Sequence, residues 1–465
     1  MINHFNFKRV DKNHLLLTND FGQHVFLSND DFHSFALNEN KLPADTRAEL
    51  EQKHFLLDPL SLYSRDLLYR LRDMKSYVFT STSLHIFVVT NACNLRCIYC
   101  QAQAEKVHKN GFMDIETGKR AIDIALQSPS NNLTFEFQGG EPLMNFPVIK
   151  QMVEYTESVK SNKNIEYTIV SNLSLLTDEM LDFFIEHRVS LSTSLDGPQT
   201  LHDYNRRHCG NESSYECAIN GIQKVRAKNY FIGAIQTTTR ASLPKSREIV
   251  RQYVSLGMNG IFLRPLTPLG FAQKDWESIG YSAEEFLEFY RTAFDEILKV
   301  NREGYYFPEQ HATIFLKKIL KGYAVNYMEL RSPCGAALGQ LAYYYDGNVY
   351  TCDEARMVAE AGNNAFCLGN VYDNDYSELI GSGTCKATCA SSVLESIPGC
   401  CDCVYQPYCG TCPVVNYASD GDIFAKNANN YRCKVYAGIL DYLFMLLREN
   451  DDTVMAILKS WVEEN

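Results

Sequence analysis

Short β-rich runs alternate with helical patterns between about residues 83 and 267, and this alternation restricts the fold more than any other feature of the chain. The β-rich runs cover residues 84–90, 133–138, 165–171, 189–194, 231–238 and 260–264. The helical patterns cover residues 114–127, 147–159, 178–187, 214–228 and 246–256. Such alternation predicts βαβ units around a parallel sheet, either open or rolled into a barrel. Ligands of such sheets bind at the carboxyl ends of the strands, so the residues after each run are candidates for chemistry.

Three cysteines follow the first run: Cys93, Cys97 and Cys100, in the segment Asn-Ala-Cys-Asn-Leu-Arg-Cys-Ile-Tyr-Cys. Thiols at this spacing can direct three thiolates to one point, which suits three corners of a [4Fe–4S] cube and leaves the fourth iron without a protein ligand. Zinc is the competing interpretation, but structural zinc sites close with four ligands, and no second Cys-x-x-Cys pair follows for more than a hundred residues. Three buried free cysteines, which need no fixed spacing, are the third interpretation.

Distinctive residues also follow the next strands. After the second run comes Gly139-Gly140-Glu141-Pro142, where two glycines let a ligand approach the backbone and Glu141 can accept hydrogen bonds from an ammonium group. A plain strand-to-helix turn is the alternative. Ser171 and Asn172 follow the third run, and Ser194 opens a Ser-Leu-Asp-Gly-Pro segment after the fourth. Such short polar side chains can reach ribose hydroxyls, although they could equally cap helices.

Composition and charge exclude several classes of function. The chain has 465 residues, enough for two or three domains, and a formal net charge of -12 with no basic stripe or tail. This balance argues against nucleic acid and anionic membranes as partners. No run approaches the length of a membrane span, and the N-terminus lacks the apolar stretch of a signal peptide. We therefore expect a cytoplasmic protein, in which sixteen cysteines indicate metal or cluster ligands rather than disulfides.

A second set of cysteines lies in the C-terminal third. Cys334 precedes a hairpin signal, Asp346-Gly347 between β-rich arms, that ends in Cys352. The remaining members are Cys400, Cys403, Cys409, Cys412 and Cys433. Seven cysteines cannot saturate two four-thiolate sites, but one complete site and one three-cysteine site would fit. The spacing indicates iron–sulfur clusters or zinc.

The first triplet resembles the cluster loop of the radical S-adenosylmethionine (SAM) enzymes, C-x3-C-x2-C with an aromatic residue, here Tyr99, before the last cysteine. The resemblance implies a [4Fe–4S] cluster that binds SAM and cleaves it reductively to a 5′-deoxyadenosyl radical. It also implies SAM contacts from Gly139, Gly140, Glu141, Ser171, Asn172, Ser194 and one of the two adjacent arginines, Arg206 or Arg207, of which we take Arg207 as the candidate. The segment 264–270 resembles the end of the family's barrel.

The C-terminal cysteines resemble the SPASM domain, the auxiliary-cluster extension of many radical SAM maturases. By that resemblance Cys400, Cys403, Cys409 and Cys433 hold one auxiliary [4Fe–4S] cluster, and Cys334, Cys352 and Cys412 hold the other. The position where some relatives carry a further cysteine is Gln340, so the second of these clusters has an open iron, a non-cysteine ligand or another cysteine. Asp353 matches an aspartate thought to act as general base in sulfatase-maturing relatives; an exposed hairpin aspartate is the alternative.

The alternation predicts an α/β fold, and the resemblances imply a partial (β/α)6 radical SAM barrel with an N-terminal small α+β module and a C-terminal SPASM domain. We expect the module in residues 1–75, the barrel in 80–310, the SPASM domain in 330–440 and C-terminal helices in 441–465. The module contains three short runs typical of strands, at residues 5–9, 15–18 and 24–27, and two helical patterns. It resembles winged-helix modules that add a leader peptide to a sheet edge, although a structural cap for the barrel is equally consistent.

The segments 350–357 and 405–414 look closest to the His-Xaa-Ser system maturases of bacterial ribosomal-peptide clusters. That resemblance implies an oxidoreductase that modifies a peptide or protein, with a partner polypeptide carrying His-Xaa-Ser repeats and an electron donor such as flavodoxin or ferredoxin. The rival enzyme is an anaerobic sulfatase-type maturase that forms formylglycine. A rival of another class is a non-catalytic iron–sulfur or zinc scaffold that binds a peptide.

Overall fold

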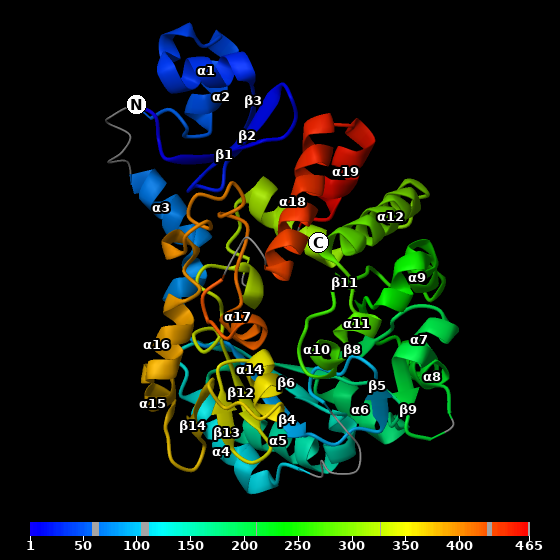
Figure 1. Cartoon of the computed structure of the whole chain (residues 1–465). Helices are drawn as coiled ribbons and strands as arrows, with labels where there is room; N and C mark the ends of the chain where they lie inside the picture. The colour runs from blue at the N-terminus through cyan, green and yellow to red at the C-terminus, as the bar shows by residue number, and fades with distance from the viewer. Residues whose placement is uncertain (58–64, 104–110, 211, 326, 426–429, 464–465) are drawn as a thin grey trace.

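The computed structural model describes residues 1–57, 65–103, 111–210, 212–325, 327–425 and 430–463. The N-terminal strands and helices α1 (Asn29–Leu37) and α2 (Ala44–Gln52) lie at one end of the molecule and the large sheet lies at the other (Figure 1). Helices α18 (Tyr431–Glu449) and α19 (Asp452–Ser460) pack beside α12 (Ala283–Arg302) in the region between these two ends. None of the helices in the described part of the chain combines the length and apolar character needed to cross a bilayer.

The large sheet contains all six predicted strands in parallel. They are β4 (Leu84–Thr90), β6 (Asn132–Gly139), β7 (Asn164–Val170), β8 (Ser190–Ser194), β10 (Ile232–Thr237) and β11 (Leu263–Arg264). They lie side by side in the order β4-β6-β7-β8-β10-β11, so each strand neighbours the next one of this series in the chain. The fold class predicted from the alternation is therefore confirmed, and the carboxyl ends of the strands meet at one edge.

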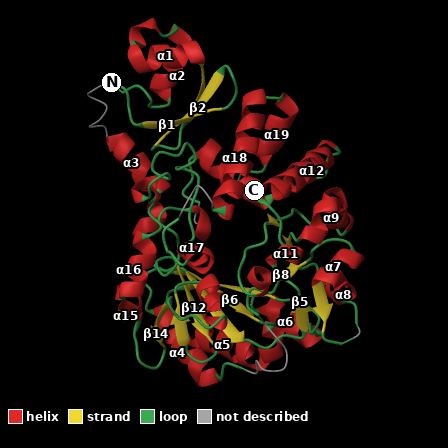
Figure 2. Ribbon diagram, in the orientation of Figure 1, coloured by secondary structure: helices red, strands yellow, loops and turns green. Residues whose placement is uncertain are grey.

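The predicted helices cover the outer face of this sheet (Figure 2). They are α4 (Ile115–Leu126), α5 (Phe146–Val159), α6 (Asp178–Glu186), α8 (Ser214–Ala227) and α9 (Ser246–Ser255). Side chains of Asp114, Thr177 and Ser213 cap α4, α6 and α8 at their N-termini. Their apolar faces pack on alternate residues of the strands, such as Phe87 and Val89 of β4, to form the main hydrophobic core.

The C-terminal cysteine region extends the same sheet. Strand β12 (Gln340–Tyr344) pairs in parallel with β4, and β13 (Asn348–Tyr350) and β14 (Cys367–Asn370) continue it in antiparallel order. The predicted hairpin joins β12 to β13, with Gly347 at a φ of 88° that favours glycine. Because β12 pairs with the strand that precedes Cys93, this region is tied directly to the first cysteine loop.

The N-terminal module is a three-stranded antiparallel sheet with its own small core. It contains β1 (Phe5–Arg9), β2 (His14–Asn19), β3 (His24–Ser28), α1 (Asn29–Leu37) and α2 (Ala44–Gln52). Its core includes Leu17, Phe35 and Phe55. The module rests on the C-terminal cysteine loop: the Asn6 side chain donates to the carbonyls of Cys401 and Cys403, and Thr18 Oγ1 donates to that of Val404 at 2.7 Å.

The remaining elements connect these parts. The helices are α3 (Arg65–Met74), α7 (Gln199–Asn205), α10 (Phe271–Lys274), α11 (Trp276–Ile279), α13 (Gln310–Leu316), α14 (Asp353–Glu360), α15 (Tyr376–Gly381), α16 (Gly383–Ala390) and α17 (Pro413–Asp420). Two short strands, β5 (Leu95–Cys97) and β9 (Arg206–His208), form a separate antiparallel pair. Helix α18 carries Cys433 in its first turn, so the boundary predicted between residues 440 and 441 falls inside a continuous helix.

Candidate active site

A cavity of about 120 Å³ lies where the carboxyl ends of the barrel strands meet the first cysteine loop. Its lining comprises Cys93, Leu95, Cys97, Gln138, Gly139, Gly140, Glu141, Val170, Ser171, Asn172, Ser194 and Arg206. Residues predicted separately from several strand ends therefore surround one space. Cys100 does not line the cavity, but it is close enough to interact electrostatically with both Cys93 and Cys97.

The Gly-Gly-Glu segment is held against the residues that lead into the cysteine loop. The Gly140 amide donates to the Thr90 carbonyl and the Glu141 amide to the Ala92 carbonyl, each at 2.9 Å. A Cβ atom on Gly139 would lie 2.4 Å from the Thr90 oxygen, and one on Gly140 would lie 2.2 Å from the Ala92 oxygen. The glycines thus allow two chain segments to approach each other, a reason in addition to the ligand approach that the sequence predicts.

Gly140→Ala is expected to lower the free energy of unfolding by about 1–3 kcal/mol, because the new methyl group meets a backbone carbonyl that has little room to move. Gly233→Ala in β10 is the matched control, since a Cβ there has no atom within 4 Å. We expect that control to unfold at or slightly above the wild-type urea midpoint. Equal midpoints for the two variants would contradict this account of the Gly-Gly segment.

Glu141 is fully buried and joins two strand ends. Its carboxylate accepts hydrogen bonds from Ser171 Oγ at 2.7 Å, from the Asn172 amide at 2.8 Å and from the Leu143 amide at 3.1 Å. Burial raises the pKa of Glu141 to about 7, against the lowering effect of these donors. A carboxylate has about four acceptor positions, so Glu141 retains capacity for a further donor from a ligand.

Asn172 fixes the cysteine loop rather than only lining the cavity. Its Nδ2 donates to Asn94 Oδ1 at 3.0 Å, and Asn94 Nδ2 donates to Ser174 Oγ at 2.7 Å. Asn94 directly follows Cys93, so this amide pair anchors the loop to the end of β7.

Asp196 is a site residue to which the sequence reasoning gave no role. It is fully buried, and its carboxylate accepts hydrogen bonds from Tyr99 Oη at 2.8 Å and Asn205 Nδ2 at 3.1 Å. Arg206 Nε lies 3.2 Å from the same carboxylate. Asp196 thus links the cysteine loop, through Tyr99, to the arginine that lines the cavity. The sequence signal that could have identified Asp196 is its position at a strand end, directly before a glycine. In the structure that glycine, Gly197, has a φ of 139°.

The structure distinguishes the two adjacent arginines. Cys97 and Arg206 are register partners in the β5–β9 pair, and the Arg206 side chain lies over the Tyr99 ring at 5.2 Å and lines the cavity. Arg207, our choice from the sequence, is exposed and lies over the Tyr204 ring instead. Ser194 lies at the end of β8 and lines the cavity.

The surroundings of Cys93 and Cys97 disfavour their thiolate forms, so these thiolates would need the positive charge of a bound cluster. Burial raises the pKa of the Cys93 thiol well above its usual value and that of Cys97 to about 12, although the Arg206 charge opposes the latter shift. The thiolate is the ligating form, so metal binding here must displace protons. Within the described ranges, no three His, Cys, Asp or Glu side chains gather closely enough for a single metal ion. A [4Fe–4S] cube needs no such convergence, because each cysteine binds its own iron.

Seven C-terminal cysteines lie in two separate places in the structure. Cys400, Cys403, Cys409 and Cys433 line one cavity, together with Arg432 and Asn430. Cys334, Cys352 and Cys412 are buried together in the second hydrophobic cluster. Burial is the main cause that raises the pKa of all three thiols, and the Glu354 carboxylate adds to the shift. The donor sets therefore fit one complete site and one three-cysteine site with a carboxylate nearby.

Asp353 is the first residue of α14, directly after Cys352, and it is partly buried rather than exposed on the hairpin. Its carboxylate pairs with the buried Arg356, whose Nε lies at 3.1 Å. Its charge also contributes to raising the pKa of Glu136 on β6, for which burial is the main cause. Asp353 therefore lies on the side of α14 that faces the barrel.

Comparison with known proteins assigns the central part of the chain to a protein family. Residues 87–241 match the family model described as the Radical SAM superfamily. This segment holds the cysteine loop, the Gly-Gly-Glu segment and Asp196, and it is therefore a radical SAM domain. Such a domain implies an enzyme that uses a [4Fe–4S] cluster and SAM.

Several relatives span most of the chain at low identity. A cysteine-type anaerobic sulfatase-maturating enzyme of Clostridium novyi is 24% identical over 71% of this chain and 87% of its own length. A serine-type enzyme of Bacteroides thetaiotaomicron is 23% identical over 78% of this chain and 90% of its own. An uncharacterized protein of Methanocaldococcus jannaschii is 28% identical over 63% of this chain and 90% of its own.

Solved structures share the fold. The structure described as native anSMEcpe with bound AdoMet superposes with a TM-score of 0.68 at 18% identity, covering 81% of this chain and 99% of that one. Streptococcus suis SuiB bound to S-adenosylmethionine superposes with a TM-score of 0.54 at 14% identity, covering 91% and 97%. The α/β fold with its central parallel sheet is thus the fold of known SAM-binding structures.

Proposed function

We propose that this protein is a radical SAM maturase that modifies a peptide or protein in the cytoplasm. The observation that carries the proposal is the single cavity in which Cys93, Cys97, Glu141, Ser194 and Arg206 meet. Cys93, Cys97 and Cys100 would hold a [4Fe–4S] cluster with one open iron. When bound, the cluster and SAM supply a 5′-deoxyadenosyl radical that abstracts a hydrogen from the substrate.

The residues around the cavity would orient SAM. Glu141 retains acceptor capacity for the SAM ammonium group, and Ser171 and Asn172 hold that carboxylate in place. Arg206, rather than Arg207, would pair with the SAM carboxylate and Ser194 would contact a ribose hydroxyl, because both line the cavity. Asp196 fixes both Arg206 and Tyr99, so it acts as a positioning residue.

Auxiliary clusters in the two C-terminal cysteine groups are part of the proposal. The cavity lined by Cys400, Cys403, Cys409 and Cys433 supports a fully ligated [4Fe–4S] cluster. Cys334, Cys352 and Cys412 would hold the other, with one iron not bound by cysteine. Asp353 would take a proton as the substrate radical is oxidised, and Arg356 holds its carboxylate in position. An external donor such as flavodoxin or ferredoxin would supply electrons.

The substrate is proposed to be a ribosomal peptide with His-Xaa-Ser repeats, on the resemblance of residues 350–357 and 405–414. The N-terminal module supports a peptide partner, because β1 and β3 are edge strands and a peptide can add to such an edge. Sulfatase-type maturation is the second candidate, and it is supported by the names of the relatives in Clostridium novyi and Bacteroides thetaiotaomicron.

Incubation with SAM, a reductant and two peptides separates these candidates. One peptide carries His-Xaa-Ser repeats, and the other carries a sulfatase-type cysteine or serine motif. We expect mass spectrometry to show a change in the repeat peptide, accompanied by 5′-deoxyadenosine, and no change in the sulfatase peptide. Conversion of the cysteine or serine to formylglycine would assign the second function instead. The same reaction with Arg207→Ala should retain most activity, whereas Arg206→Ala should lose it.

A further inference from the structure

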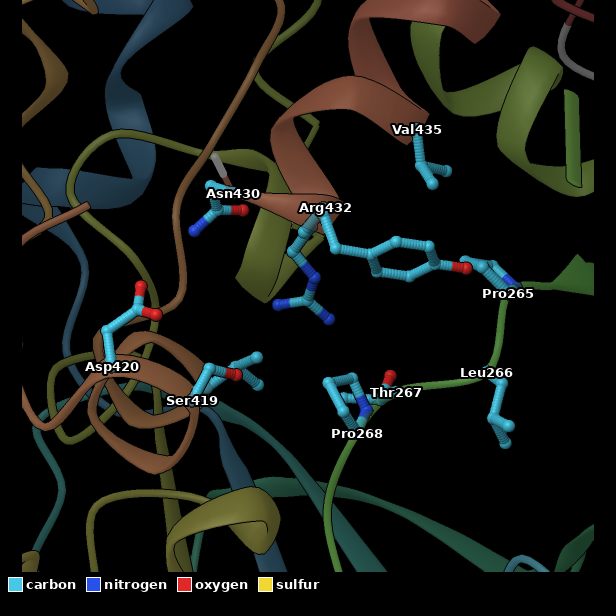
Figure 3. Close-up of a pocket in the computed structure, with 11 residues that line it drawn as sticks. Pro265, Leu266, Thr267, Pro268, Ser419, Asp420, Asn430, Arg432 and Val435 are labelled. Carbon is cyan, nitrogen blue, oxygen red and sulfur yellow. The ribbon is translucent and has the colours of Figure 1, made fainter. Parts of the chain in front are cut away.

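A second cavity, of about 120 Å³, lies between the end of the barrel and the C-terminal helices. One wall is the segment after β11, Pro265 to Pro268, and the other is formed by α17 and the first turn of α18 (Figure 3). Apolar side chains, including Leu266, Val415 and Val435, line much of it. A volume of this size accommodates a single amino-acid side chain.

Arg432 provides the charge in this cavity. Figure 3 shows its guanidinium group pointing into the space between Ser419 and Pro268. One nitrogen, Nη2, lies 2.8 Å from Glu329 Oε2, and the guanidinium lies over the Tyr436 ring. The other nitrogen, Nη1, is buried and has no hydrogen-bond partner among the residues that the structure describes. A buried charged donor without a partner costs free energy, so this position suits an oxygen acceptor supplied from outside the chain.

The position of the cavity connects it to both cysteine regions. The Thr267 carbonyl, on the barrel wall, accepts a hydrogen bond from Gln101 Nε2 at 3.4 Å, and the Phe271 amide donates to the Cys100 carbonyl at 3.0 Å. On the opposite wall, Arg432 immediately precedes Cys433 and also lines the four-cysteine cavity. A group held here is therefore adjacent to the loop of the radical site and to the C-terminal cysteines.

We infer that this cavity binds a carboxylate of the substrate peptide through Arg432. A guanidinium forms its strongest hydrogen bonds with carboxylates, and Glu329 already fixes its orientation. The carboxylate belongs either to an acidic side chain or to the peptide C-terminus. Asp420, exposed at the rim, repels such a group and limits its affinity. This inference rests on the proposed function, because it names a specificity feature of the peptide substrate.

Binding of small probes to the anaerobically reconstituted protein tests the inference without any turnover. The probes are N-acetylglutamate α-amide and its neutral isostere N-acetylglutamine amide, with N-acetylglycine and N-acetylglycinamide as the pair for a terminal carboxylate. We expect one acidic probe to bind about tenfold more tightly than its neutral partner in calorimetric or NMR titrations. The pair that shows the difference identifies the side chain or the chain end as the source.

Two variants establish where the carboxylate binds. Arg432→Gln should abolish the difference between acidic and neutral probes while keeping the iron content of the wild type. Asp420→Asn, which leaves Arg432 and its neighbours unchanged, should strengthen binding of the acidic probe several-fold. If Arg432→Gln loses iron, the Asp420→Asn result alone decides whether the carboxylate binds in this cavity. Equal binding of acidic and neutral probes to the wild type, or an unchanged affinity in Asp420→Asn, overturns the inference even if SAM cleavage is normal.

Discussion

Alanine in place of Cys93, Cys97 and Cys100 together is expected to lower the iron content of the reconstituted protein from about twelve to about eight atoms per chain. The reason is that under the proposed function these three thiols would hold one cluster, whereas the seven C-terminal cysteines lie in separate groups and would keep their own iron. The measurement is anaerobic reconstitution followed by iron and sulfide analysis.

Cys217→Ala is the matched control for this experiment. Cys217 lies on α8 and is assigned to none of the three cysteine groups. We expect this variant to bind as much iron as the wild type. An unchanged iron content in the triple variant, or zinc in place of iron in the wild type, would contradict the assignment of the first loop.

Asp196→Ala is expected to produce the largest loss of stability outside the cysteines, about 3–5 kcal/mol, because it leaves the largely buried Arg206 charge without its carboxylate. It also removes the acceptor of the Tyr99 hydroxyl, so the cysteine loop loses an anchor. We therefore expect a lower urea midpoint together with weaker SAM binding. Asp196→Asn should restore part of the midpoint but little of the SAM affinity.

Asp182→Ala provides the comparison for Asp196→Ala. Asp182 pairs with Lys228 on the protein surface, where both side chains are substantially exposed. Exposed ion pairs contribute about 0–1 kcal/mol, so we expect a nearly unchanged urea midpoint. A similar loss of stability in both aspartate variants would show that Asp196 has no special role in the site.

Local sequence signals were sufficient for the elements of the barrel. The strand and helix patterns from residue 84 to 256 are periodic, and the structure has a strand or helix at each of them within about two residues. Cys93, Glu141 and Ser194 could be grouped from sequence because parallel strands bring their carboxyl ends to one edge.

The features that depend on pairing between distant segments could not be predicted in this way. Which of Arg206 and Arg207 enters the cavity depends on the register of β9 against β5, which lie more than a hundred residues apart. The pairing of β12 with β4 also joins segments that are far apart in the sequence, so local patterns do not predict it. The role of Asp196 depends on partners from two distant segments, Tyr99 on the cysteine loop and the adjacent Asn205 and Arg206. The buried Arg432 nitrogen that has no hydrogen-bond partner among the described residues can be identified only after α18 packs against the barrel.

We propose that SAM is cleaved at the Cys93–Cys100 loop. The most direct measurement is 5′-deoxyadenosine formed from SAM under a strong reductant in the absence of oxygen, compared between the wild type and the triple cysteine variant. We predict product from the wild type and from Cys217→Ala, and none above background from the triple variant. Product from the triple variant, or none from a fully iron-loaded wild type, would contradict the account.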